Sequence, residues 1–475
     1  MKKTISAVIL CAMLCQLAAS TACGEHGGGS ETTQVEQVSD TTVTAETGEF
    51  KAADISFNGG EFIIAENDVG DWMQSAFITE ENGDTLNDSI YKRNILIEEL
   101  YNVKLGGYKI IGGRNSQKLT ELTNCILAGD KEFDIAFIPG ELSSIIFNNP
   151  DYLIPLSSVD TLDLSHSWWD AQSVEAMTFK ERTISATGDM AVSTTGASTI
   201  TLFSKSLADS YKIDMYGIVN DGKFTLDKAY ELAQTVKSDL NGDTKYDFDS
   251  DRFGITFEAL NLPQMILASG EHMTKNNKDG VPELALTTPR ATEVVQKMIA
   301  LIDDSESVVS GGDTTIMFNE DRLLLWVTNL QRMNSARSYT ADFGLIPFPK
   351  YDESDEYSAP VNTYWCSWIV IPSTNTDTER TGYMLDALGY YSQQYVTPAF
   401  IETSVTTKAL RDDESAEILK LVLPNKVFDA GMFFDWGYWM LYRMMLNHNP
   451  NLSSVLAENE AQINASIESF IEALG

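Results

Sequence analysis

The residues from 239 to 251 have the types and spacing of a calcium-binding loop. Residues with oxygen ligands stand at positions 1, 3, 5, 7 and 9 of an EF-hand-like pattern: Asp239, Asn241, Asp243, Lys245 and Asp247. Lys245, at position 7, would contribute its backbone carbonyl, and the other four their side-chain oxygens. The match is incomplete, because position 6 is Thr244 instead of glycine and position 12 is Ser250 instead of a chelating glutamate. An acidic surface turn at Asn241-Gly242 explains the same residues. The sequence therefore leaves a structural Ca²⁺ site and a solvated turn both open.

Four tryptophans are candidates for stacking on a sugar, because a flat aromatic face can cover the CH groups of a pyranose ring. They are Trp72, Trp326, Trp365 and Trp436. Core packing is the alternative for each of them, and it is the commoner environment of a large aromatic side chain. If Trp436 binds sugar, Trp436→Ala should weaken sugar affinity and leave folding cooperative. We expect Trp168 and Trp169 to be structural, because neither follows a predicted strand.

Polar side chains follow several predicted strands, where open α/β sheets bind their ligands. Asp68 follows the first strand and Glu141 the third, while Glu258 and Asn261 follow a strand predicted at residues 252–257. A chain of this length is expected to form two lobes, and Asp189 lies at the first point where it would pass between them. A solvated loop position is the alternative for each of these side chains.

Catalytic constellations are not indicated. The four histidines, His26, His166, His272 and His448, have no partners at metal-ligand spacing, and no GxSxG motif is present. A pair of carboxylates could hydrolyse a glycosidic bond, but acidic residues are so abundant that their presence does not point to an enzyme. A surface glycan hydrolase stays as an alternative function, and so does an adhesin or sensor that takes no part in transport.

Alternating strands and helices would position these side chains. The first half of the chain predicts strands at 61–65, 103–111 and 133–138 and helices at 88–101 and 117–128. The second half predicts helices at 226–238, 289–303 and 321–335 and strands at 252–257, 314–319, 343–347 and 365–372. Further helices are predicted at 379–394, 415–423, 433–447 and 456–474. Such alternation favours mostly parallel sheets flanked by helices, and the chain is long enough for two lobes with separate cores.

The first residues have the pattern of a lipoprotein signal peptide. Lys2 and Lys3 precede an apolar run at residues 5–17, and a small-residue stretch then ends at Cys23. Cleavage before Cys23 would allow its thiol to take a diacylglycerol anchor, with palmitate added, and would leave residues 23–53 as a flexible tether. Ser20 departs from the leucine that is commonest at its position, so a simple secretory signal is the alternative.

Charge and composition exclude several classes of protein. The formal charge of −36 becomes −38 when the signal peptide, with its two lysines and no acid, is removed. So acidic a surface would repel nucleic acid. Beyond the signal peptide, no uncharged apolar run reaches the roughly 18 residues that a membrane helix needs. Cys125 and Cys366 are the remaining thiols if Cys23 carries lipid. Lone cysteines are usually buried small hydrophobes, and a disulfide between these two is the alternative.

Short phrases spread over residues 60–440 resemble the lipid-anchored extracellular solute-binding proteins of ABC importers, particularly a family 1-like, carbohydrate-binding group. The phrases are NDSIY and IEELYNV at 87–103, FDI at 133–135, WWD at 168–170, TGD at 187–189, VTPAF at 396–400, RDDES at 411–415 and FDAG at 428–431. No single phrase is specific, but their order is.

The resemblance implies a type II periplasmic-binding-protein-like architecture, in which two α/β lobes are joined by about three chain crossings and ligand lies between them. We expect lobe 1 at residues 54–195 and 358–405, and lobe 2 at 196–357 and 406–475. In relatives, aromatics near the positions of Trp326 and Trp436 commonly stack on ligand. Relatives also often carry a similar acidic segment, which favours a structural Ca²⁺ at residues 239–247. The implied function is a monomeric, lipid-anchored receptor that is not an enzyme, requires no cofactor and delivers a sugar or oligosaccharide to an ABC permease.

Overall fold

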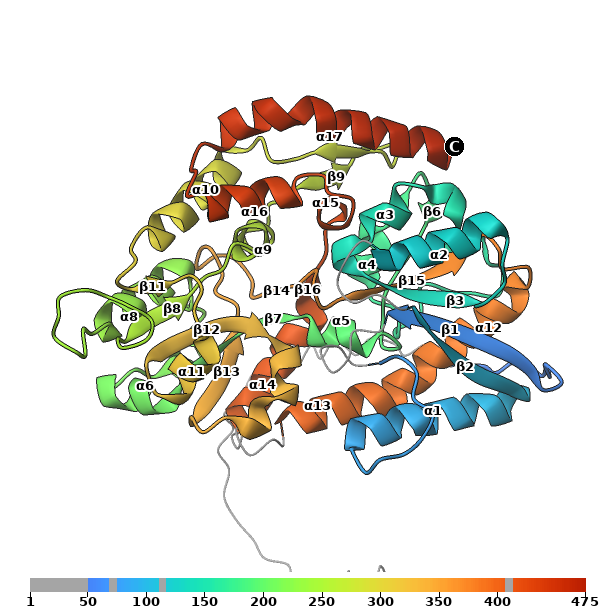
Figure 1. Ribbon diagram of the computed structural model, residues 1–475, viewed down its shortest axis with the longest axis horizontal. Coiled ribbons are helices and arrows are strands. Elements are labelled where there is room, and N and C mark those ends of the chain that lie inside the picture. Colours follow the sequence, from blue (N-terminus) through green and yellow to red (C-terminus); the bar gives the residue numbers. More distant parts are fainter. Residues whose placement is uncertain (1–49, 68–74, 111–116, 406–412) are drawn as a thin grey trace, which may run out of the picture. The chain divides into compact units, whose positions relative to one another are not determined.

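The computed structural model describes residues 50–67, 75–110, 117–405 and 413–475. Asp68, Trp72, Cys23 and most of the predicted tether therefore lie outside the described residues. The described chain contains two five-stranded sheets and three two-stranded ones (Figure 1).

The first sheet confirms the β-α-β-α-β prediction. Its strands follow the order β2-β1-β3-β15-β4 and comprise β1 (Gly60–Asn67), β2 (Val103–Ile110), β3 (Ile135–Pro139), β4 (Leu153–Ile154) and β15 (Ser367–Pro372). β1 pairs in parallel with β2 and β3, whereas β15 runs antiparallel to β3 and β4. The helices α1 (Thr85–Tyr101) and α2 (Gln117–Ala128) supply the crossovers that parallel strands require.

The second sheet follows the order β11-β8-β12-β7-β13. Its strands are β7 (Thr199–Ser204), β8 (Phe253–Thr256), β11 (Val308–Val309), β12 (Leu323–Asn329) and β13 (Phe343–Pro347). β8 pairs in parallel with β11 and β12, while β7 runs antiparallel to β12 and β13. The carboxyl ends of β8 and β12 and the amino end of β7 therefore meet at one edge of this sheet.

Two predicted elements in this sheet were wrong. Residues 314–319, predicted as a strand, form helix α11 (Thr314–Asn319), because the side chain of Asp313 accepts hydrogen bonds from Thr315 N and Ile316 N and caps it. Residues 321–335, predicted as a helix, form β12 and then a 3₁₀ helix, η5 (Leu330–Asn334). β12 lies between two partners and is buried along most of its length, and a short apolar run of this kind has no period that separates strand from helix.

Most other predicted helices are present with shifted ends. They are α8 (Leu226–Val236), α10 (Pro289–Ile302), α12 (Thr378–Tyr391), α14 (Asp413–Val422), α16 (Tyr438–Leu446) and α17 (Leu452–Leu474). A π-helix, η7 (Ser392–Val396), joins α12 to α13 (Thr397–Val405).

The remaining elements are short. The short helices are η2 (Gly140–Leu142), α3 (Ser144–Phe147), η3 (Pro150–Tyr152), η4 (Leu156–Ser158), α4 (Ala171–Ala176), α5 (Val192–Gly196), α6 (Lys205–Tyr211), α7 (Met215–Asn220), α9 (Asn261–Ala268), η6 (Ala336–Ser338), η8 (Leu423–Asn425) and α15 (Ala430–Phe433). The short strands are β5 (Thr178–Phe179), β6 (Arg182–Thr183), β9 (Thr274–Asn276), β10 (Pro282–Leu284), β14 (Ala359–Pro360) and β16 (Lys426–Val427).

The chain passes between the two large sheets more than once. It leaves the first sheet through α5 into β7, returns from β13 through β14 to β15, and then places α14 against β13. The side chains of β1 alternate, so that Phe62 and Ile64 join one apolar cluster and Ala65 joins another. The exact lobe boundaries stay a prediction.

The packing of α8 against β8 gives a test of the second sheet. A Cβ atom added at Gly254 would lie 2.0 Å from the Cα atom of Ala233 on α8. Because this neighbour is backbone, it cannot move aside cheaply, and we expect Gly254→Ala to lower the free energy of unfolding by about 1–3 kcal/mol. Urea denaturation measures this change. Thr235→Ala, on the exposed side of α8, is the control and should change stability by less than about 0.5 kcal/mol; equal effects would contradict the packing.

Candidate ligand-binding site

A polar and aromatic pocket of about 260 Å³ lies at the edge of the second sheet where β8 and β12 end. Its size is close to the lower end of the roughly 300–1,000 Å³ that small-molecule sites occupy. The lining residues are Thr199, Glu258, Ala259, Leu260, Asn261, Gln264, Trp326, Val327, Thr328, Asn329, Arg332, Asn362, Tyr364, Trp365 and Tyr442. They come from β7, the segment between β8 and α9, α9 itself, β12, η5, α16 and the segment before β15.

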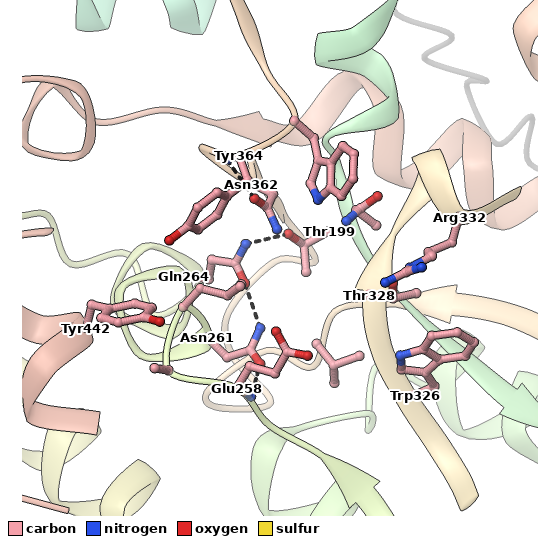
Figure 2. Close-up of a pocket in the computed structure, with 15 residues that line it drawn as sticks. Thr199, Glu258, Asn261, Gln264, Trp326, Thr328, Arg332, Asn362, Tyr364 and Tyr442 are labelled. Carbon is pink, nitrogen blue, oxygen red and sulfur yellow. Dashed lines mark hydrogen bonds between the residues drawn. The ribbon is translucent and has the colours of Figure 1, made fainter. Parts of the chain in front are cut away.

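A chain of hydrogen bonds orders the polar floor of the pocket. The backbone N–H of Glu258 donates to Asn261 Oδ1 at 2.7 Å, and Asn261 Nδ2 donates to Gln264 Oε1 at 2.7 Å. Gln264 Nε2 then donates to Thr199 Oγ1 at 2.8 Å. Figure 2 shows this chain running between Tyr442 on one side of the view and Trp326 and Arg332 on the other. Asn261 and Gln264 are three residues apart on α9, a spacing at which helical side chains meet.

Aromatic faces contribute the apolar part of the pocket. Tyr364, Trp365 and Tyr442 are partly exposed, and they lie beside polar amides such as Asn362. Trp439 connects two of them, since its ring centroid is 6.4 Å from that of Tyr364 and 5.2 Å from that of Tyr442. Flat apolar faces next to planar hydrogen-bonding groups suit a ligand that has both CH faces and hydroxyl groups.

Two oppositely charged side chains, Glu258 and Arg332, line the pocket and form no ion pair with each other. The guanidinium of Arg332 lies 5.6 Å from the ring centroid of Trp326, a cation–π contact. The side chain of Glu258 is open to the pocket, yet the surrounding protein removes enough water to raise the pKa of its carboxyl group, while the charge of Arg332 lowers it. Among the described residues, neither side chain has a hydrogen-bond or ion-pair partner. Both are therefore available to a ligand.

The structure brings together four of the residues selected from the sequence, Glu258, Asn261, Trp326 and Trp365. Trp326 reaches the pocket from the middle of strand β12 and not from the start of a helix, as the sequence suggested. It is 3 % exposed and packs on Phe318, so it forms a wall of the pocket more than an open stacking face.

Three other selected residues lie elsewhere. Trp436 is fully buried, stacks on Phe434 with ring centroids 4.2 Å apart and donates to Ser466 Oγ, so it is a core residue here. Asp189 accepts hydrogen bonds from Thr397 Oγ1 and Gln393 Nε2, and burial raises the pKa of its carboxyl group. It anchors η7 and α13. Glu141 lies on η2 outside the pocket.

Several pocket residues escaped the sequence reasoning. They are Thr199, Gln264, Thr328, Asn329, Arg332, Asn362, Tyr364 and Tyr442. A correct assignment of β12 as a strand would have placed Asn329 and Arg332 at its carboxyl end, where ligands bind. The spacing of Gln264 from Asn261 was a second usable signal. Nothing in the sequence indicated Thr199 or Tyr442, which arrive from distant segments.

The acidic loop after α8 is held by its own hydrogen bonds. Asp239 accepts from the backbone N–H groups of Gly242 and Thr244, and Asp247 accepts from those of Asp249 and Ser250. Across the described residues, no group of three or more His, Cys, Asp or Glu side chains is arranged to hold a metal ion. The calcium interpretation stays a prediction.

The two-lobed α/β fold and a pocket at the carboxyl edge of a sheet define the type II periplasmic-binding-protein architecture, as predicted. No family model and no curated protein matches the sequence. None of the helices in the described ranges is long and apolar enough to span a bilayer.

Solved structures of carbohydrate-binding ABC solute-binding proteins are similar to this chain. An ABC substrate-binding protein from Listeria monocytogenes, in complex with cycloalternan, has a TM-score of 0.55 and 13 % identity, covering 86 % of this chain and 99 % of its own. The cyclic alpha-maltosyl-1,6-maltose binding protein of Arthrobacter globiformis has a TM-score of 0.54 and 14 % identity, covering 87 % and 97 %. The maltodextrin-binding domain MalE from Bdellovibrio bacteriovorus, bound to maltotriose, has a TM-score of 0.52 and 15 % identity, covering 87 % and 100 %. At such identities, the likeness shows the fold.

The position of Trp436 predicts a stability defect in place of a binding defect. Trp436→Ala removes a large side chain from the aromatic cluster with Phe434 and Phe470, and we expect it to lower the free energy of unfolding by about 3–5 kcal/mol. Chemical denaturation measures the change. Trp365→Ala, at a partly exposed position, is the comparison and should cost clearly less; a stable Trp436→Ala protein would contradict the assignment.

The environment of Glu258 predicts a pH-dependent effect on stability. Because the pKa of Glu258 is raised in the folded chain, the unfolded chain loses this proton at lower pH, and ionisation opposes folding above that pH. Glu258→Gln removes the penalty. We expect the variant to be more stable than the wild type at neutral pH and to equal it below about pH 4, near the ordinary pKa of glutamate. Thermal unfolding from pH 3 to 8 tests this, and curves that differ by a constant amount would refute it.

Proposed function

We propose that this chain is the solute-binding receptor of an ABC importer and binds a sugar or oligosaccharide in the pocket at the ends of β8 and β12. The observation that carries the proposal is the combination of partly exposed aromatic faces, Tyr364, Trp365 and Tyr442, with an ordered polar network in one pocket. Sugar rings present weakly apolar CH faces and a rim of hydroxyl groups, so both kinds of surface have a use.

The similar structures support this proposal through what they contain. Their ligands include cycloalternan and maltotriose, which are chains or rings of sugar units. The unpaired Glu258 carboxylate can accept from hydroxyl groups, and the Arg332 guanidinium can donate to them. The hydroxyl groups of a neutral sugar can serve as donors to the carboxylate and as acceptors from the guanidinium.

Binding without catalysis is part of the proposal. Glycoside hydrolysis uses two carboxyl groups that flank the bond, and Glu258 is the single acid among the described residues that line the pocket. We infer that the receptor closes on its sugar by a hinge motion of the lobes and then docks, as a monomer, on the permease subunits.

The proposal places the receptor on the outer face of the cytoplasmic membrane. A lipid on Cys23, after removal of residues 1–22, would hold it beside the permease and raise its effective concentration there. The tether at residues 23–53 would give it reach.

A binding experiment tests the sugar site. Isothermal titration of the mature chain with maltose, maltotriose and cyclic glucans should detect binding by at least one of them, with no shorter product in chromatography afterwards. Trp365→Ala and Tyr442→Ala should each weaken that binding about tenfold, because stacking area is lost. Tyr211→Ala, which changes an aromatic residue outside the pocket, is the control. Failure of every sugar to bind, or cleavage of one, would overturn the proposal.

A labelling experiment tests the anchor. Expression of the full chain in a bacterium fed labelled palmitate should label the wild type and leave Cys23→Ser unlabelled and released from membranes. Cys125→Ser, which removes a thiol from the folded part, is the matched control and should stay labelled. An unlabelled wild-type protein secreted in soluble form would favour the simple secretory signal instead.

A further inference from the structure

The hydrogen-bond chain on the pocket floor can run in a single direction. It starts at the backbone N–H of Glu258, which can donate but cannot accept. Asn261 must therefore turn its carbonyl oxygen towards Glu258 and its NH₂ towards Gln264. Gln264 must in turn accept with its oxygen and donate with its nitrogen, to Thr199. The one group with fixed polarity thus orients both amides.

Burial keeps this orientation from reversing. The exposed fraction is 3 % for Asn261, 1 % for Gln264 and 2 % for Thr199. Turning either amide around would place two oxygens or two NH₂ groups face to face, away from water. Buried polar groups that lose their partners are costly, so the chain has one stable arrangement.

The series of hydrogen bonds ends at the hydroxyl group of Thr199. The hydroxyl of Thr199 accepts from Gln264, so its own hydrogen is left for another acceptor. Asn329 is the residue paired with Thr199 across β7 and β12, and it also lines the pocket. Its Oδ1 has no hydrogen-bond partner among the described residues, so it does not take this hydrogen.

We propose that the hydroxyl group of Thr199 donates a hydrogen bond to the bound solute. Asn261 and Gln264 are positioning residues: because Gln264 donates to the oxygen of Thr199, the hydroxyl hydrogen stays free to donate. The inference rests on the proposed function and specifies its ligand further. Thr199 needs an acceptor oxygen on the solute, whereas the carboxyl group of Glu258 needs a donor when it is ionised. A sugar with neighbouring free hydroxyl groups satisfies both, and a derivative without one of these hydroxyls does not.

Substitutions at Thr199 test the donor. Thr199→Val removes the hydroxyl at nearly constant shape and should weaken binding of maltotriose, or of the panel sugar that the wild type binds, roughly five- to tenfold. Thr199→Ser keeps the hydroxyl and should stay within about twofold of the wild type. The control is Thr201→Val, two residues along the same strand at a fully buried position outside the pocket, and it should bind like the wild type.

A set of monodeoxy derivatives of the same sugar separates ligand contact from a structural role. If Thr199 contacts one hydroxyl, the derivative lacking it should bind Thr199→Val and wild type equally, while the other derivatives keep the loss. Gln264→Leu removes the group that orients the Thr199 hydroxyl and should therefore reduce the discrimination against that one derivative. A merely structural defect would weaken every derivative by the same factor.

The outcomes distinguish two failures. If the wild type binds sugar normally, two results would overturn this inference alone. One is an unchanged affinity of Thr199→Val, and the other is an equal loss of affinity for all derivatives. Absence of binding of any sugar by the wild type would overturn the proposed function, and the inference with it.

Discussion

The pairing of β12 with β7 on one side and with β8 on the other is the constraint on which the pocket depends. β8 and β12 run in parallel, so their carboxyl ends meet, and β7 runs antiparallel, so its first residue joins them. This register places Thr199 opposite Asn329 and brings Glu258 to the same edge. A shift by one residue would turn these side chains to the other face of the sheet.

The pocket has a buried polar floor, formed by Thr199, Asn261 and Gln264, and a more exposed rim of aromatic and charged side chains. The floor is a buried row of polar side chains joined by three hydrogen bonds within the protein, and the hydroxyl hydrogen of Thr199 stands at its end. The rim carries aromatic faces and two charged side chains, Glu258 and Arg332, that form no ion pair in the described chain; Arg332 contacts the ring of Trp326. Preformed polar floors of this kind favour specificity, because a ligand that does not match leaves buried groups unpaired.

Much of the fold could be predicted from the sequence, and the exceptions have physical causes. The alternation of elements in the first sheet and the boundaries of α2 and β13 were predicted correctly, because their patterns are local. The apolar run of β12 was ambiguous, since a strand buried on both faces shows neither a helical period nor strict alternation. That error hid Arg332 and Asn329 from the site.

The sequence by itself determined the acidic charge, the signal-like beginning, the alternating strands and helices of the first sheet, and the positions of Glu258 and Asn261 after a strand. These properties depend on residues that lie near each other in the chain. Only the tertiary structure decided that Thr199 and Tyr442 belong to the pocket and that Trp436 belongs to the core. The partners of these residues come from segments far away in sequence, so their environment is set by strand pairing and packing, which no local pattern encodes.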